Sequence, residues 1–222
     1  MTDRIEPCGK AIRHPWVAAL YDWLCEAAER RGLAEHRRRV VGMASGEVLE
    51  IGGGTGRNLA HYPAGVSRVT VLEPDLHMYR RALPKSRRAP VPVRLVEGVA
   101  EALPFRAASF DTVVATLVFC TIADPAGAVR QVARVLKPGG RLVFLEHVRA
   151  ETPGRARLQD LLTPLQRRLA AGCHPNRDTV GTLREAGLRV VQIERVEFGP
   201  PWVRPHVLGS AVPAGEGISR GG

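Results

Sequence analysis

Closely spaced glycines at residues 52–56 are the feature of the sequence most suggestive of chemistry. The run LEIGGGTG, residues 49–56, places Gly52, Gly53, Gly54 and Gly56 directly after a short apolar segment. Glycine adopts a positive φ at little cost and carries no Cβ, so a ligand can approach the backbone of such a turn closely. The turn therefore predicts the floor of a binding site for a nucleotide-like ligand.

Two carboxylates flank this turn and indicate what it binds. Glu73 lies 21 positions after Gly52, at the end of the next apolar run, where a carboxylate can accept hydrogen bonds from both hydroxyls of a ribose. Glu50 precedes the glycines by two positions, where it suits an ammonium group better than a pyrophosphate. The glycines also alternate as GxGxG, unlike the GxGxxG of dinucleotide sites. We expect a ribose with a cationic amino-acid tail, and a nicotinamide dinucleotide is the alternative.

Apolar runs and helical patterns alternate around the turn. Strands are predicted at residues 47–52, 68–74, 92–98, 110–119 and 141–148. Asp75 and Asp124 are predicted N-caps of the helices that follow the second and fourth strands, and Gly139 is expected just past the end of the latter helix. This alternation predicts a mostly parallel sheet with helices on both faces.

The two ends of the chain depart from this rhythm. Residues 14–43 read as helix, divided at Gly32. Residues 150–176 read as a helical insertion interrupted by Pro164, followed by a helix at residues 177–186. Two strands at residues 188–198 and 204–212 are expected to pair antiparallel, and residues 214–222 form a polar, glycine-rich tail that is predicted to be disordered.

Composition narrows the class of protein. The 222 residues suffice for one domain, and no run approaches the roughly 20 apolar residues that cross a bilayer. The net charge of +10 invites a nucleic-acid partner, but aromatic residues make up only 5% of the chain, so none is expected. The start of the sequence has no apolar signal segment, which favours the cytoplasm. The four cysteines form no CxxC pair, so neither a disulfide framework nor a metal site is expected.

Four motifs occur in a fixed order along the chain: LEIGGGTG, VLEP, GVAEALPF followed by SFDTVVA, and VLKPGGRLVFLEH. In these motifs the chain resembles the class I S-adenosylmethionine-dependent methyltransferases. The resemblance implies a Rossmann-like, doubly wound α/β fold whose seven strands are ordered 3-2-1-4-5-7-6, the last strand being antiparallel. It also implies an N-terminal helical lid at residues 1–44, a methyltransferase domain at residues 45–213 and a substrate cap at residues 150–176.

The same resemblance implies S-adenosyl-L-methionine as the methyl donor and suggests which residues bind it. These are Glu50, Gly52, Gly53, Gly54, Gly56, Glu73, Pro74, Leu76, Met78, Ala100, Glu101, Thr116 and, from the lid, Tyr21. Relatives often have an aspartate at the position of Val99, bonded to the adenine amino group. Valine cannot make that bond, so Glu101 or a backbone carbonyl is expected to replace it, although Glu101 would equally serve as a helix cap.

The end of the fourth predicted strand bears on the methyl acceptor. Leu117, Phe119 and Cys120 suggest an apolar pocket, and the Asp/Asn-Pro-Pro-aromatic motif of enzymes that methylate adenine or glutamine in macromolecules is absent. The blocks LEHVRA, AGCH and WVRPHVLG resemble small methyltransferases related to the animal thiol methyltransferases. That resemblance implies S-methylation of a small lipophilic thiol. Transfer to oxygen, nitrogen or carbon of a lipid or secondary metabolite, and a non-catalytic protein that binds the donor, are the alternatives.

Histidines are the candidate bases for such a reaction, because an imidazole can take a proton from a thiol. His147 is the first candidate, followed by His174 and His206, and each could instead be structural. Glu146 paired with Arg204 would close the pocket, and Cys173 would line it. We further expect a monomer or homodimer with a small-molecule acceptor. No N-terminal membrane anchor is expected, but peripheral contact with a membrane is compatible with the sequence.

Overall fold

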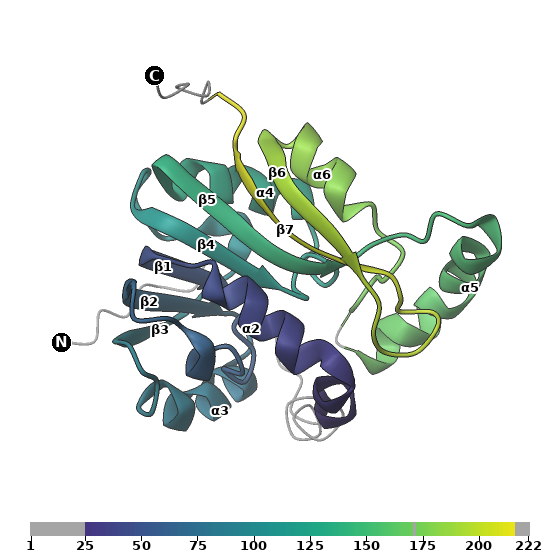
Figure 1. Ribbon diagram of the computed structural model, residues 1–222, viewed down its shortest axis with the longest axis horizontal. Helices are drawn as coiled ribbons and strands as arrows, with labels where there is room; N and C mark the ends of the chain where they lie inside the picture. Colours follow the sequence, from purple (N-terminus) through teal and green to yellow (C-terminus); the bar gives the residue numbers. More distant parts are fainter. Residues whose placement is uncertain (1–24, 171, 216–222) are drawn as a thin grey trace.

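A computed structural model describes residues 25–170 and 172–215 of the protein, and one sheet of seven strands organises them (Figure 1). The strand order β3-β2-β1-β4-β5-β7-β6 confirms the predicted topology. The pairings β1 with β2, β1 with β4, β2 with β3 and β4 with β5 are parallel, whereas β7 runs antiparallel to both neighbours. The strands are β1 (Gly46–Ile51), β2 (Val66–Glu73), β3 (Val93–Glu97), β4 (Phe110–Thr116), β5 (Leu136–His147), β6 (Leu188–Val196) and β7 (His206–Pro213).

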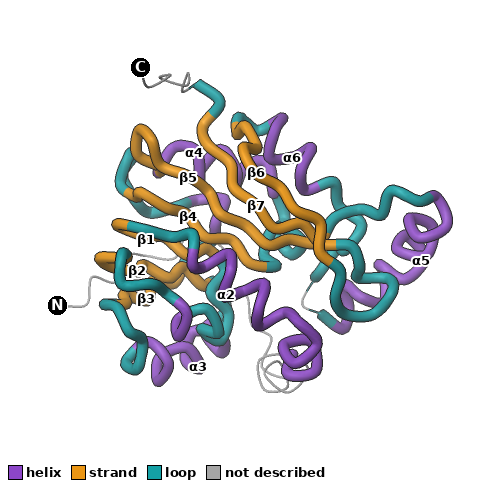
Figure 2. Tube along the Cα trace, viewed as in Figure 1, coloured by secondary structure: helices purple, strands orange, loops and turns teal. Residues whose placement is uncertain are grey.

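Helical segments cover both faces of this sheet (Figure 2). They are η1 (Glu29–Leu33), α2 (Ala34–Gly42), η2 (Leu59–His61), α3 (Leu76–Ser86), η3 (Ala100–Ala102), α4 (Pro125–Val135), α5 (Pro153–Leu169) and α6 (Thr179–Glu185). Helix α2 covers one face, and α4 and α6 cover the other. The sheet is thus the middle of three layers, as in other doubly wound folds.

The central strands are apolar on both sides because both faces are covered. Along β4, Val113 packs into the cluster beneath α4, and Val114 packs into the cluster beneath α2. Along β5, Val143 and Phe144 alternate between the same two clusters. All four side chains are completely buried. The two-residue period of a strand accounts for this division.

Three predicted boundary signals are confirmed. The Asp75 side chain accepts the backbone N–H of His77 at 2.8 Å and thereby caps α3. Asp124 accepts the N–H of Gly127 at 2.8 Å at the start of α4. Gly32, at φ +115°, interrupts the helical segment that precedes the sheet. These caps fix where α3 and α4 leave the strands that carry the site.

Several predicted boundaries are wrong. Helix α5 continues through Pro164, because the ring removes only one backbone donor and the helix is largely exposed. Helix α4 ends at Val135, and β5 is assigned from Leu136, so Gly139 lies inside β5. Helix α6 begins at Thr179, where Asp178 provides the cap, rather than at residue 177.

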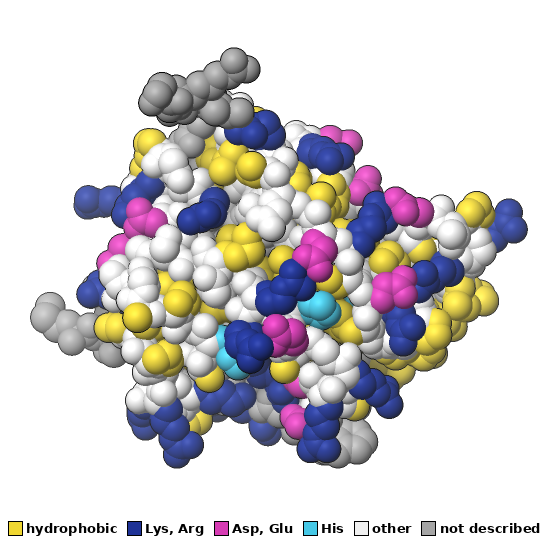
Figure 3. Space-filling view, viewed as in Figure 1, with side chains coloured by type: hydrophobic (Ala, Val, Ile, Leu, Met, Phe, Trp, Pro, Cys, Tyr) yellow, Lys and Arg dark blue, Asp and Glu magenta, His cyan; other side chains and the backbone are white. Residues whose placement is uncertain are grey.

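The lid predicted at residues 1–44 lies partly outside the described residues, and Tyr21 is among the residues that are not described. Within the described ranges, no helix combines the length and the apolar character needed to cross a membrane. On the face shown in Figure 3, arginine and lysine side chains are interspersed with acidic ones. That mixture differs from the single basic stripe that marks many nucleic-acid sites.

Candidate active site

The glycine turn directly follows β1 and has the backbone that its sequence predicts. Gly52, Gly54 and Gly56 have φ values of +62°, +56° and +76°, in the left-handed region that favours glycine. A Cβ at Gly52 would overlap the side chain of Val118, whereas a Cβ at Gly54 would meet no atom within 4 Å. Gly52 is therefore required by packing, and Gly54 presents bare backbone to an open space.

Glu73 ends β2 and fixes this turn from the neighbouring strand. One carboxylate oxygen accepts the N–H of Gly54 at 2.7 Å, and the other accepts the N–H of Asp75 at 2.8 Å. Burial raises the pKa of Glu73 to about 7, although the two backbone donors oppose that shift. Each oxygen retains a lone pair for a further donor, so the carboxylate can bind a diol while it holds the turn.

A cavity of about 520 Å³ opens beside Glu73 and the turn. Its lining includes eight of the predicted site residues: Gly52, Gly54, Glu73, Pro74, Met78, Ala100, Glu101 and Leu117. Leu76, Gly53, Gly56 and Phe119 were also predicted at the site but are not part of this lining. Phe119 lies instead in the core beneath α4, 1% exposed.

Sequence reasoning missed a further set of lining residues. They are Leu72, Asp75, Gly98, Val118, Thr121, Ile122, Ala123, Arg167 and Gly172. Most of them adjoin a predicted residue, so the motifs could have been extended by a few positions. Arg167 carries no such signal, because only the fold brings the end of α5 to the cavity, whereas Gly172 adjoins the predicted Cys173 in the AGCH block.

Glu101 and Val99, which the sequence motifs place near the adenine, both line the cavity. The Glu101 carboxylate accepts the N–H of Ala123 at 3.2 Å and lies near the N-terminus of α4. The N–H of Asp124, at 3.5 Å, points to the same carboxylate oxygen. The helix-cap interpretation of Glu101 is thus close to what the structure shows. Val99 lines the cavity and offers a backbone carbonyl but no side-chain acceptor.

Glu50 faces a second, smaller cavity of about 20 Å³ behind the turn, which Thr116 also lines. The Glu50 carboxylate accepts hydrogen bonds from the Asn58 amide at 2.9 Å and the Tyr62 hydroxyl at 2.7 Å. Burial raises the pKa of Glu50 to about 7, while these donors and Arg37 lower it. A space of this size suits a single water molecule, which favours the water-mediated form of the predicted contact.

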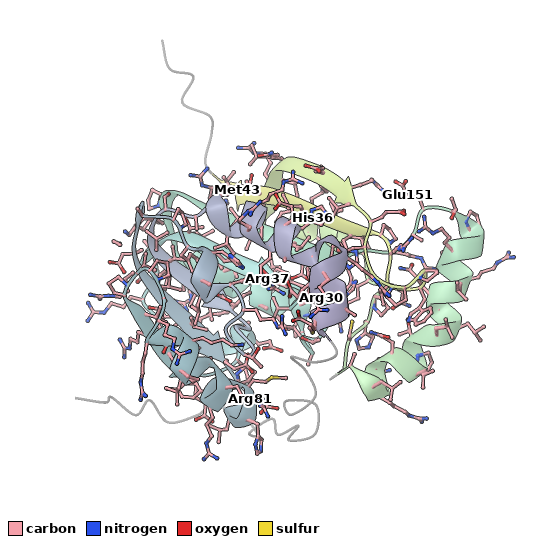
Figure 4. All side chains as sticks on the ribbon, turned by 60° about the horizontal axis from the view of Figure 1, so that its bottom comes forward. Arg30, His36, Arg37, Met43, Arg81 and Glu151 are labelled. Atoms are coloured by element: carbon pink, nitrogen blue, oxygen red, sulfur yellow. The ribbon has the colours of Figure 1, made fainter. Side chains whose placement is uncertain are left out.

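Arg37 joins α2 to this group. Its guanidinium donates to the Asn58 side chain at 2.8 Å and to Glu29 at 2.8 Å. The side chain is buried beneath the helix, and Figure 4 shows it between α2 and the sheet. Because Asn58 also donates to the Thr116 hydroxyl at 3.2 Å, one hydrogen-bonded chain connects α2, Asn58 and β4.

The turn after β4 is strained and is held from β5. Leu117 has φ +56°, a conformation that costs a bulky residue free energy and that clusters at functional sites. Glu146 accepts the N–H groups of Val118 at 2.9 Å and Phe119 at 3.2 Å. The predicted pairing of Glu146 with Arg204 is wrong, since Arg204 donates to the carbonyl of Gly199 at 2.7 Å. Glu146 is a buried clamp on the turn, and burial raises its pKa to about 7.

The three candidate histidines have different surroundings. His147 Nδ1 lies 3.1 Å from the carbonyl oxygen of Val203, so Nδ1 is the protonated nitrogen in the neutral ring. His206 is completely buried and stacks on Phe198 at 3.7 Å between ring centroids, and burial lowers its pKa. A charged form of His206 is disfavoured there, so a role as base is not supported. His174 Nδ1 lies 3.2 Å from the carbonyl oxygen of Cys120.

Two cysteines meet the imidazole of His147 in a buried cluster. The sulfur atoms of Cys120 and Cys173 are 3.5 Å apart, and both thiols are free. The two sulfurs and a ring nitrogen of His147 all lie within 4.8 Å of one another, and all three residues are buried. A hydrogen bond between the thiols lowers the pKa of Cys173 and raises that of Cys120. The loop around Cys120 and the segment around Cys173 both reach the cavity, through Thr121 and Gly172.

The cavity is therefore lined by a carboxylate that suits a diol and by apolar residues of the turn after β4. The buried cluster of two sulfurs and an imidazole adjoins its lining in the chain, at Thr121 and Gly172. A family model described as a methyltransferase domain matches residues 49–144. Thiol S-methyltransferase TMT1B of Homo sapiens is 34% identical over 194 residues, which cover 83% of this chain and 78% of the relative. Thiol S-methyltransferase TMT1A of Homo sapiens is 31% identical over 194 residues, which cover 84% of this chain and 79% of the relative.

The fold is also that of solved structures. One is N-methyltransferase NodS of Bradyrhizobium japonicum WM9 in complex with S-adenosyl-L-homocysteine. It superposes on this chain with a TM-score of 0.64 at 19% identity, covering 86% of this chain and 91% of that one. At this identity the likeness concerns the fold alone, whereas the two human relatives are similar in sequence over most of their length.

Proposed function

Because the chain belongs to the class I S-adenosylmethionine-dependent methyltransferases, we propose that it methylates the sulfur of a small lipophilic thiol. One observation carries the choice of acceptor. The apolar end of the cavity, at Leu117 and Ile122, lies next to the segments that hold Cys120 and Cys173. Support also comes from the two human relatives, which are thiol S-methyltransferases by name.

The donor, S-adenosyl-L-methionine, fits the acidic end of the cavity in this proposal. Glu73 accepts its ribose hydroxyls, since each carboxylate oxygen has a lone pair beyond its backbone donor. Met78 and Ala100 contact the adenine, because both are apolar residues of the lining. The methionine tail lies over Gly54, where no Cβ obstructs it, and Glu50 reaches the ammonium group through a water molecule.

In the donor, the methyl group is bonded to a positively charged sulfur. A thiolate attacks the methyl carbon in line with that bond and displaces the sulfur. No covalent intermediate with the protein is needed, so the chain contributes mainly alignment and a dry environment. Leu117, Val118 and Ile122 give the acceptor an apolar wall. Glu146 holds the backbone of that wall by its bonds to Val118 and Phe119, so the wall is rigid before the acceptor arrives.

The test is turnover with a panel of acceptors. We expect labelled thioether from aliphatic thiols and S-adenosyl-L-homocysteine in equal amount, with little product from matched alcohols and amines. Ile122→Asp, which places a charge on the apolar wall, should raise KM for the thiol and leave the affinity for S-adenosyl-L-homocysteine within about threefold of the original protein. If only the alcohol, amine or carbon acceptors gave product, methyl transfer to oxygen, nitrogen or carbon would replace the proposed transfer to sulfur. Tight binding of S-adenosyl-L-homocysteine with no turnover of any acceptor would indicate a non-catalytic binding protein.

Helix α5 supports peripheral contact with an anionic membrane surface as part of this proposal. Leu158, Leu161, Leu165 and Leu169 recur at spacings of three and four and are 36%, 74%, 55% and 65% exposed. Exposed arginines at positions 157, 167 and 168 belong to the same helix. In Figure 1 α5 projects beyond the end of the sheet, and in Figure 3 apolar side chains gather at that edge. Leucines flanked by arginines are typical of helices that lie in the headgroup region, and a lipophilic acceptor would be concentrated there.

A further inference from the structure

Cys120, His147 and Cys173 come together from three separate parts of the fold. Cys120 belongs to the turn after β4, His147 ends β5, and Cys173 lies between α5 and α6. Their exposed fractions are 1%, 8% and 5%. Buried free cysteines often serve only as small apolar side chains, but here two of them meet an imidazole, and the transfer of methyl groups from the donor needs no nucleophile of the protein.

We propose that Cys120, His147 and Cys173 form a binding site for a thiophilic divalent cation, for which Zn²⁺ is the best-suited ion. Two cysteines and one histidine are a ligand set that zinc accepts when a fourth position is left for water or substrate. With Zn–S bonds of about 2.3 Å, two thiolates at a tetrahedral angle are about 3.8 Å apart. The observed separation of 3.5 Å is near that value and far from the roughly 2.05 Å of a disulfide.

The bond of His147 to Val203 is an independent sign of a metal ligand. Histidines that bind metal usually donate their other ring N–H to a carbonyl or carboxylate, which fixes the ring and leaves one nitrogen free as a ligand. His147 Nδ1 has such a partner in the carbonyl of Val203, at 3.1 Å. The other nitrogen, Nε2, then keeps a free lone pair, and both sulfurs lie within 4.8 Å of a ring nitrogen of His147.

Charge balance also favours a divalent ion. A cation of charge +2 with two thiolates is neutral overall, and a neutral group is far less costly to bury than a single thiolate. In this arrangement His147 is a ligand rather than the base that its position in the sequence suggested.

The role of this metal in catalysis rests on the proposed function. The acceptor thiol takes the fourth position and releases its proton to water. A lone pair of its sulfur then forms the new carbon–sulfur bond, while the bond from the methyl carbon to the donor sulfur breaks and leaves its electron pair on S-adenosyl-L-homocysteine. The neutral thioether is a poorer ligand than a thiolate and dissociates. A free thiol of pKa about 8.5 is only about 3% ionised at pH 7, so complete ionisation would raise the rate by up to about 30-fold.

The test is metal binding by the full chain, purified under reducing conditions without a histidine tag. After incubation with Zn²⁺ and removal of excess ion, we expect one equivalent of zinc per chain. Co²⁺ in its place should show sulfur-to-cobalt charge-transfer absorption. Cys120→Ser, Cys173→Ser and His147→Gln should each lower zinc retention at least tenfold, whereas Cys25→Ser, outside the cluster, should retain it. Thermal shift with S-adenosyl-L-homocysteine establishes that each variant is folded.

The wild-type protein alone can overturn the proposal, even if a variant does not fold. Absence of stoichiometric zinc, a cobalt spectrum without charge transfer, or a Cys120–Cys173 disulfide in place of metal would each do so. Methylation of thiols at an undiminished rate by a protein free of metal would overturn the catalytic role of the metal and leave the proposed function intact. If the protein bound stoichiometric metal but formed no thioether from any thiol, the proposed function would be overturned and the proposed metal site would stand. Removal of zinc should lower kcat/KM for thiols at pH 7 by about 30-fold without changing the affinity for S-adenosyl-L-homocysteine.

Discussion

Glu73 accepts the backbone N–H of Gly54 at 2.7 Å, so the carboxylate that ends β2 fixes the turn that follows β1. This one contact joins the two features that the sequence singles out, a stretch without side chains and an acid 21 positions beyond its first glycine. The carboxylate is both a part of the scaffold and a candidate ligand for the ribose. Replacement of Glu73 should consequently lower the affinity for the donor or its product more than it lowers the free energy of unfolding.

Replacing Glu73 with glutamine should weaken binding of S-adenosyl-L-homocysteine by about 10- to 100-fold. The amide keeps one acceptor but loses the charge, and a hydrogen bond to a charged group contributes about 1.5 to 3 kcal/mol. Isothermal titration calorimetry measures the effect directly. Glu97→Gln is the matched control, because Glu97 lies opposite Glu73 at the end of β3 but does not line the cavity. Equal affinities for the two variants would contradict the assignment of Glu73 to the ribose.

Replacing Gly54 with alanine should weaken ligand binding while still allowing the protein to fold. At φ +56° an alanine costs about 1 to 2 kcal/mol, and its Cβ would meet no atom of the protein within 4 Å. The variant should therefore fold, unfold at a lower urea concentration, and bind S-adenosyl-L-homocysteine at least about tenfold more weakly than the original protein.

Gly65→Ala provides the comparison for Gly54→Ala. A Cβ at Gly65 would also meet no atom within 4 Å, and the φ of Gly65 is not positive, so both stability and affinity should be unchanged in this variant. If Gly54→Ala bound the ligand as tightly as Gly65→Ala, the turn would not be the floor of the donor site.

The free energy of unfolding without ligand should fall as pH rises from about 4.5 to above 7. Burial raises the pKa of Glu50, Glu73 and Glu146 to about 7 in the folded protein. A carboxyl whose pKa is raised on folding contributes stability below its unfolded pKa and loses it as pH passes the folded value. A shift from 4.5 to about 7 corresponds to about 3 kcal/mol for each carboxyl.

Urea denaturation at pH 5 and pH 8 measures this loss, and Glu50→Gln tests its source. The amide cannot ionise, so the variant should lose roughly a third of the pH dependence that the three carboxyls produce. A free energy of unfolding that is equal at both pH values, or a variant with unchanged pH dependence, would show that these carboxyls are not responsible.

Most of the fold and the donor end of the site could be predicted from the sequence, because the signals there are local. The glycines of the turn, the caps at Asp75 and Asp124, and the two-residue alternation of the strands each depend on neighbours in the chain. The parallel strands then bring Gly54 and Glu73 to the same edge of the sheet.

The rest of the site depends on contacts between distant segments, which no local pattern encodes. Arg167 reaches the cavity only because α5 continues through Pro164. Cys120 and Cys173 are 53 positions apart in the chain, yet their sulfurs are 3.5 Å apart. The sequence shows two scattered cysteines, and only the fold makes them a pair. Likewise, Glu146 clamps the strained turn after β4 by bonds to backbone groups that could not be anticipated from its position in β5.

Replacing Leu161 and Leu165 with serine should weaken binding to anionic membranes. Both side chains are more than half exposed on α5. Each replacement removes the roughly 1.5 to 3 kcal/mol of free energy that a leucine side chain gains when it is buried in the membrane interface. We expect the original protein to sediment with vesicles that contain phosphatidylserine and to sediment less with neutral vesicles. With the phosphatidylserine vesicles, the double variant should sediment at least tenfold less than the original protein. Val191→Ser is the control, because Val191 is 57% exposed on β6, outside α5. Equal sedimentation of the double variant and the control would show that the leucines of α5 do not contact the bilayer, and turnover of a water-soluble thiol should be unchanged in both variants.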